Sequence, residues 1–174
     1  MISYEVSLGL SITGVLILTG SFDLVAIVNH QINTGPLFGF LPAWNAFTQG
    51  GGFIVFLVAA FAETNRLPFD MAEAEQELVG GYHTEYSAMK FAMFFLGEYA
   101  NMIVAGSLVT LLFLGGWHFP GLELLGLPAA LNAIAQIFAF CFKVFLVIFL
   151  MIWARWTFPR FRYDQLMFLG WLIL

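Results

Sequence analysis

Long apolar runs alternate with shorter polar connections along the 174 residues of this chain. Runs at about 2–28, 43–62, 88–115 and 133–156 each have roughly 20 residues or more, the length a helix needs to cross a hydrocarbon core of about 30 Å. They are continuous rather than alternating with period two, which favours helices over barrel strands. A fifth run begins near Asp164 and is too short to span. We therefore predict an all-α, polytopic transmembrane protein.

The predicted architecture is a single membrane domain over residues 1–174, with about four complete spans and a truncated fifth. The short fifth run indicates a fragment of a longer chain. Composition agrees with a membrane protein, because 61% of residues are hydrophobic, 10% are charged and the mean hydropathy is +0.90. Such values exclude an ordinary soluble domain. The single cysteine, Cys141, excludes a disulfide framework or a cysteine metal site within the chain.

Cations are distributed unevenly between the connections. The connections at 29–42 and 116–132 have no Lys or Arg, whereas those at 63–90 and 155–163 hold the following cations: Arg66, Lys90, Arg155, Arg160 and Arg162. Two crossings separate the cationic connections, so both lie on one face. The positive-inside rule makes that face cytoplasmic, or matrix in a mitochondrion. Lys143, in the middle of an apolar run, is the exception.

The connection at about 63–90 and the start of the next span form a dense acidic segment. Its glutamates are Glu63, Glu73, Glu75, Glu77, Glu85 and Glu98. Glu73 and Glu77 share a face if 71–79 is helical, and repulsion between two carboxylates favours proton exchange at the pair. A solvated acidic loop is the simpler interpretation. Apolar and aromatic residues among the acids, such as Phe69 and Tyr82, favour a cavity or a subunit interface instead.

Two charged residues lie deep within predicted spans. Glu98 and Lys143 are each about ten residues into an apolar run, and a charge at such depth costs about 2.5–3.5 kcal/mol on insertion scales. One interpretation is a static ion pair between them, or between Lys143 and Glu5. The favoured one is a proton or charge relay that faces a polar axis. Glu5 and Asp23 are near the ends of the first predicted span, where a long side chain can reach the interface.

Other kinds of chemistry find little support in the sequence. His30, His83 and His118 are scattered and have no matching second pair of ligands, so no metal site is predicted. There is no dinucleotide-binding fingerprint and no phosphate-binding loop. We expect no redox cofactor held by this chain and no nucleic-acid partner.

Several segments together resemble the membrane-embedded H subunit of NADH–quinone oxidoreductase, whose mitochondrial counterpart is NADH dehydrogenase subunit 1 of respiratory complex I. The segments are AETNRLPFD at 62–70, EAE at 73–75, ELV at 77–79, GYHTEYS at 81–87, KFA at 90–92, GEY at 97–99, ISYE at 2–5 and PRFRYDQL at 159–166. The resemblance covers essentially the whole chain but only the middle and C-terminal half of a typical family member.

The resemblance implies a membrane subunit of a proton-pumping NADH:quinone oxidoreductase. Such a subunit walls the chamber that quinone enters from the bilayer, and it joins the hydrophilic and membrane arms. It implies a proton relay through Glu63, Glu73, Glu75, Glu77 and Glu98. It implies chamber residues Arg66, Phe69, Asp70, Tyr82 and Glu85, with Lys143 and Glu5 as intramembrane charges.

The same resemblance implies quinone as substrate, with flavin and iron–sulfur clusters held by partner subunits through which NADH acts. The implied partners are the hydrophilic quinone-module subunits and neighbouring membrane subunits. The location would be the bacterial or mitochondrial inner membrane, with the acidic loop on the cytoplasmic or matrix side.

Three alternatives stay open at this point. The anchor subunit of a membrane-bound hydrogenase shares the architecture without quinone. An ion-coupled secondary transporter would use broken helices and often internal repeats, and no repeat stands out here. A purely structural scaffold would use the acids for subunit docking alone.

Overall fold

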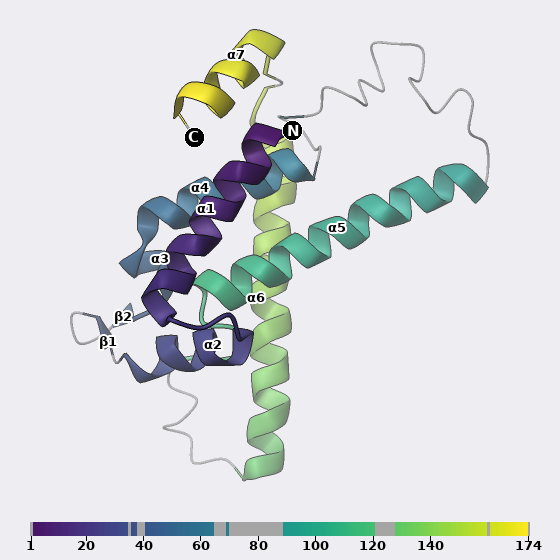
Figure 1. The fold of residues 1–174 in the computed structure, drawn as a ribbon. Helices are drawn as coiled ribbons and strands as arrows, with labels where there is room; N and C mark the ends of the chain where they lie inside the picture. Colours follow the sequence, from purple (N-terminus) through teal and green to yellow (C-terminus); the bar gives the residue numbers. More distant parts are fainter. Residues whose placement is uncertain are drawn as a thin grey trace.

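The computed structural model describes residues 2–34, 36–37, 41–64, 69, 89–120, 128–159 and 161–173. The helices in order are α1 (Ile2–Thr19), α2 (Leu24–Asn33), α3 (Asn45–Thr48), α4 (Gly50–Glu63), α5 (Met89–Phe113), α6 (Ala129–Thr157) and α7 (Tyr163–Phe168), followed by a π-helical turn at Leu169–Ile173. Extended structure in these ranges is limited to β1 (Pro36–Leu37) and β2 (Leu41–Pro42), which pair antiparallel. The prediction of an all-α fold is confirmed (Figure 1).

Two helices in the described part of the chain are long and apolar enough to cross a membrane. They are Ala92–Phe113 within α5 and the whole of α6, and they match the predicted runs at 88–115 and 133–156 within a few residues. A third candidate is the bent pair of α1 and α2, while α4 is a shorter apolar helix. A polytopic helical membrane protein is therefore the observed class.

The first predicted span is a broken helix, not a continuous one. Between α1 and α2 the chain bends by 60°. Gly20 at the break has a φ of +66°, a conformation that glycine adopts without steric cost. Asp23 then caps the new helix, because its carboxylate accepts a hydrogen bond from the Val25 backbone N–H at 3.1 Å. Local chemistry here overrides the apolar pattern on which the prediction depended.

The second predicted span, at 43–62, is also interrupted. The single turn of α3 ends at Gln49, whose φ of −123° and ψ of 51° are not helical, and α4 starts at Gly50. The Gln49 side-chain amide donates a hydrogen bond of 2.9 Å to the Gly14 carbonyl of α1. The side chain of Gln49 thus ties this break to α1.

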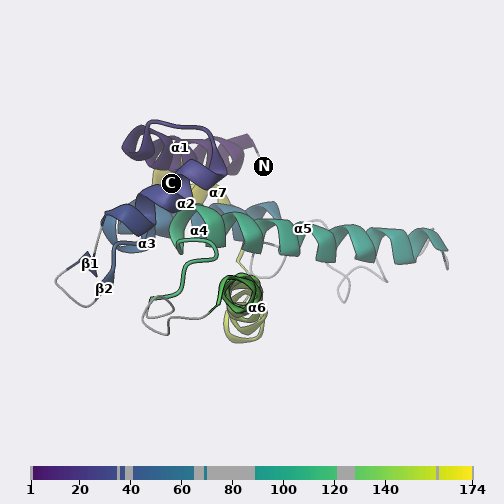
Figure 2. The same cartoon turned by 90° about the horizontal axis from the view of Figure 1, so that it is seen from below.

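Helix α5 is the central helix of the fold. It packs against α2 and α4 on one side and α6 on the other, while α1 packs along α4. Figure 2 shows α5 lying between the α1–α2 pair and α6, which is seen end-on. The core between these helices includes Val15, Ile27, Phe56, Val109 and Phe113, all at most 1% exposed.

The C-terminal end of α5 is bound by two buried amide side chains. Gln31 of α2 is 3% exposed; it donates to the Leu111 and Leu112 carbonyls at 3.2 Å each and accepts from the backbone N–H groups of Asn45 and Gly115. The Asn45 side chain, 1% exposed, also donates to the Leu112 carbonyl, at 2.8 Å. Carbonyls of the last helical turn lack intrahelical partners, so these two amides supply the bonds that the helix cannot.

Two adjacent glycines make the turn after α5. Gly115 and Gly116 have φ values of +69° and +53°, and the Gly116 N–H bonds back to the Thr110 carbonyl at 2.9 Å, as in a Schellman-type C-cap. A Cβ on Gly115 would lie 2.6 Å from the Trp44 indole nitrogen, and one on Gly116 would lie 2.8 Å from a Val28 methyl group. Both positions therefore need glycine for conformation and for space.

Gly116→Ala should destabilise the protein by roughly 2–4 kcal/mol, from the left-handed conformation and from the clash with Val28. The check is a lowered midpoint of thermal unfolding for the full-length protein in mild detergent. Gly9→Ala is the matched control, because a Cβ at that helical position would meet nothing within 4 Å beyond the adjoining residues of its own helix. An unchanged midpoint for Gly116→Ala would contradict the described turn.

Gln31→Met should destabilise the protein by about 3–5 kcal/mol, because it leaves buried carbonyls and N–H groups without partners. The same thermal measurement applies. Gln136→Met is the control, since Gln136 is half-buried on α6 and forms no side-chain hydrogen bond within the described residues. Equal effects of the two substitutions would show that Gln31 does not bind the end of α5.

Candidate functional site

A cavity of about 260 Å³ opens between α1, α4 and α5. Its polar lining residues are Glu5 from α1, Glu63 and Thr64 from the end of α4, and Asn101 from α5. Its apolar lining residues are Leu8, Phe56, Ala60, Val104, Ala105 and Leu108. Three helices thus each contribute at least one polar side chain to an otherwise apolar space.

Helical spacing explains why these residues meet. Along α5, Asn101, Val104, Ala105 and Leu108 recur at intervals of three or four, so they lie on one face. Glu5 is in the first turn of α1 and Glu63 is the last residue of α4. Because both line one cavity and their helices pack together, the start of α1 lies beside the end of α4. The fold brings together two acids that are 58 positions apart in sequence.

The acids in the cavity have no protein partner in the part of the chain that the structure describes. The Thr64 hydroxyl donates to the Phe61 carbonyl at 2.9 Å and is thereby occupied. The side chains of Glu5, Glu63 and Asn101 form no hydrogen bond or ion pair with the described residues. Carboxylates in that situation can bind water and exchange protons, and an amide can orient water by donating and accepting together.

Glu98 lies on α5 one turn before Asn101 and is half-buried. Residues three apart on a helix are neighbours on its surface, with Cβ atoms about 5–6 Å apart. Glu98 is not among the cavity-lining residues. The structure therefore places Glu5 and Glu63 in one cavity and Glu98 one helical turn before Asn101, outside the lining of that cavity.

Lys143 does not pair with a carboxylate among the described residues. Its ammonium donates to the carbonyls of Leu114 at 2.7 Å, Gly116 at 3.1 Å and His118 at 2.5 Å. It also lies 4.4 Å from the centroid of the Trp44 ring. Glu98 precedes Leu114 by 16 residues, which corresponds to about 24 Å along a helix. The ion pair considered from sequence is replaced by a carbonyl cage at the other end of α5.

Phe69 is buried, at 9% exposure, between two other rings. Its centroid lies 5.9 Å from that of Tyr4 and 5.6 Å from that of Phe161. Its role in a quinone chamber stays a prediction. The remaining predicted residues, Arg66, Asp70, Glu73, Glu75, Glu77, Tyr82 and Glu85, lie outside the described residues.

Sequence reasoning missed three polar residues that the structure makes important. Asn101 follows Glu98 by three positions, and this spacing alone could have placed both on one helix face. The sequence signal for Gln31 and Asn45 was weaker, because each is only an amide within or close to the predicted connection at 29–42. Their long-range partners at 111–115 could not be read from the sequence.

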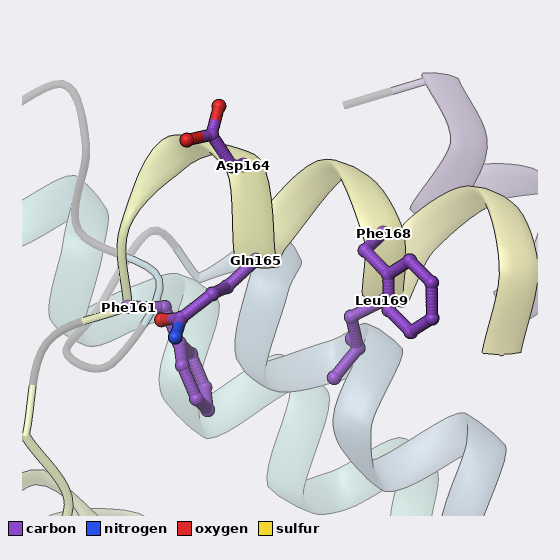
Figure 3. Close-up of a pocket in the computed structure, with 5 residues that line it drawn as sticks. All are labelled: Phe161, Asp164, Gln165, Phe168 and Leu169. Carbon is purple, nitrogen blue, oxygen red and sulfur yellow. The ribbon is translucent and has the colours of Figure 1, made fainter.

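A second cavity, of about 400 Å³, lies beside α7 and is lined by Phe161, Asp164, Gln165, Phe168 and Leu169. In Figure 3 the Asp164 carboxylate points away from the other lining side chains, while Gln165 extends toward Phe161. The Gln165 side-chain oxygen accepts from the Arg162 backbone N–H at 3.2 Å. This depression has a single acid, Asp164, whereas the other cavity brings together Glu5 and Glu63 and is therefore the better candidate. The described residues contain no group of three or more His, Cys, Asp or Glu suited to a metal ion.

Comparison with known proteins gives a family. The whole chain, residues 1–174, matches the family described as NADH dehydrogenase. It is 53% identical to a protein of Koribacter versatilis named as H subunit 2 of NADH-quinone oxidoreductase, over 100% of this chain and 48% of that protein. It is 48% identical to the H subunit of NADH-quinone oxidoreductase of Salinibacter ruber, over 98% of this chain and 50% of the relative.

A third relative, NADH-quinone oxidoreductase subunit 8 of Rhodothermus marinus, is 50% identical over 98% of this chain and 51% of its own length. The chain thus spans about half the length of the curated relatives it matches. These matches confirm the resemblance drawn from the motifs at 62–70 and 81–87.

Proposed function

The chain belongs to the NADH dehydrogenase family, and from that premise we propose that it forms part of the membrane subunit that links quinone reduction to proton translocation in an NADH:quinone oxidoreductase. The observation that carries this proposal is the cavity in which Glu5 and Glu63 meet without protein partners in the described part of the chain. Relatives that match over the full chain are named as the H subunit of NADH-quinone oxidoreductase.

Reduction of a quinone to a quinol consumes two electrons and two protons. In the proposed complex the electrons come from NADH through flavin and iron–sulfur clusters in partner subunits. The loop residues Arg66, Phe69, Asp70, Tyr82 and Glu85 would line the quinone chamber, on the cytoplasmic or matrix side. Charge that appears and disappears at the quinone acts on nearby carboxylates, and it acts strongly because the surroundings have a low dielectric constant.

The loop acids Glu73, Glu75 and Glu77 would pass this change to Glu63. Glu63 is described at the end of α4 and faces the cavity with Glu5. A volume of about 260 Å³ has room for several water molecules, since each occupies about 30 Å³ in the liquid. Water between the two carboxylates would carry a proton from one to the other.

Asn101 has a different role in this scheme. Its amide does not titrate, but it donates and accepts hydrogen bonds, so it orients water between Glu5 and Glu63. Glu98, one turn before Asn101 on α5, is the next proton acceptor. The proton path would then join the acidic loop, the cavity and Glu98 on α5.

Glu63→Gln and Glu5→Gln should each lower proton pumping coupled to quinone reduction by about tenfold or more, because loss of a positioned proton-exchanging group typically costs at least that factor. Glu98→Gln should do the same. The measurement is inhibitor-sensitive NADH–quinone reductase activity together with proton uptake by vesicles, with the full-length subunit in its assembled complex.

Asp164→Asn is the matched control, because this exposed acid points away from its neighbours and lies outside the cavity (Figure 3). It should pump like the unaltered protein. Assembled complex that pumps normally with both Glu63→Gln and Glu5→Gln would rule out a relay through the cavity. If the assembled complex shows hydrogenase activity and no quinone reduction, then quinone is not its substrate.

A further inference from the structure

Lys143 lies in the middle of α6 and is only 5% exposed. Every hydrogen-bond donor of its ammonium group nevertheless has a partner. The group has three N–H donors, and each meets one backbone carbonyl, of Leu114, Gly116 and His118. The Trp44 ring covers it at 4.4 Å, a distance at which the ring face attracts a cation. We name this group of three carbonyls and one ring the ammonium seat.

The ammonium seat lies where α5 ends. The C-terminal end of a helix bears about half a negative charge, and Gln31 and Asn45 already bind the carbonyls of Leu111 and Leu112. The seat exists because Gly115 and Gly116, with positive φ values, bring alternate carbonyls of the turn to one point. A cation supplied by α6 thus neutralises the end of α5.

A second contact pins α5 to α6 close to the seat. A Cβ added to Gly106 would lie 3.4 Å from Ile148 and 3.6 Å from Val144, which adjoins Lys143. Gly106 and Leu114 are eight residues apart, or about 12 Å along the helix. The seat, directly after the last residue of α5, and this contact within α5 together fix the position of α5 along α6 and its rotation about its own axis.

That rotation decides which side chains face the cavity. Each residue of a helix is turned by about 100° from the one before it, so a rotation of that size would move Asn101 and Leu108 out of the cavity wall. We propose that Lys143 is a positioning residue, whose cation in the ammonium seat holds the rotation of α5 that presents Asn101 to Glu5 and Glu63. This proposal rests on the proposed function of the cavity.

The seat is specific for an ammonium group. Three carbonyl oxygens and an aromatic face offer no donor, so a neutral group gains little there and a carboxylate is repelled. Lys143→Ala removes three carbons and the ammonium, which together correspond to n-propylammonium. The truncated protein should therefore bind free n-propylammonium in the vacated volume.

The first test uses the full-length subunit in its assembled complex. Lys143→Met and Lys143→Ala should lower coupled proton pumping by about ten- to a hundredfold, the scale of losses caused by misplacement of about 1 Å. Added n-propylammonium chloride should restore pumping to Lys143→Ala but not to Lys143→Met, whose side chain fills the volume. Propan-1-ol should restore neither. Arg155→Gln, which removes an exposed cation from the same helix, should pump normally.

Normal pumping by assembled Lys143→Met complex would overturn the proposal, as would equal restoration by propylammonium and propanol. If the variants do not assemble, growth with n-propylammonium should restore assembly of Lys143→Ala alone, and failure to do so also overturns it.

A second measurement separates this proposal from the relay. With Cys141→Ala as background, the rate at which a small water-soluble thiol reagent labels Asn101→Cys reports the rotation of α5. Lys143→Met should change that rate several-fold, and an unchanged rate overturns the proposal. This rate does not depend on proton transfer, so it decides the role of Lys143 even where Glu5→Gln and Glu63→Gln pump normally.

Discussion

Hydrogen bonding at the C-terminal end of α5 is the constraint on which the rest of the structure depends. Helix ends leave carbonyls without partners, and in a membrane-embedded protein no water is at hand to bind them. Here Gln31, Asn45 and Lys143 come from α2, the start of α3 and α6 to bind the carbonyls at 111–118. Because α5 packs against α2, α4 and α6, the bonds at its end also fix how those helices are arranged.

The charged groups are divided between two kinds of environment. Lys143 has every donor satisfied, which offsets the cost of desolvating its charge, and such a group is suited to holding structure. Glu5 and Glu63 face a cavity and have no partner among the described residues, which suits groups that must gain and lose protons. The contrast in hydrogen bonding, rather than depth in the membrane, separates Lys143 from Glu5 and Glu63.

Much of this arrangement follows from residue pattern, and the exceptions have local causes. The spans at 88–115 and 133–156 agree with α5 and α6 within a few residues, because long apolar runs dominate them. The prediction of one continuous helix over 2–28 was wrong because the apolar pattern gives no sign of the positive φ at Gly20 or of the N-cap at Asp23. The partners of Lys143 escaped prediction because backbone carbonyls at a helix end carry no sequence signature.

The spacing of residues along α5 shows which of them share the side that lines the cavity. Lys90, Gly97 and Asn101 recur at intervals of seven and four, so they share a face with Leu108, and Glu98 lies at the edge of that face. The opposite side presents Leu96 and Ile103, which are 68% and 53% exposed. A carboxylate directed at hydrocarbon would be costly, and Glu98 is half-buried at the edge of the face that lines the cavity rather than on the side of Leu96 and Ile103. The first half of α5 extends beyond the other helices (Figure 1), so Lys90 and Gly97 continue the Asn101 face outward from the cavity.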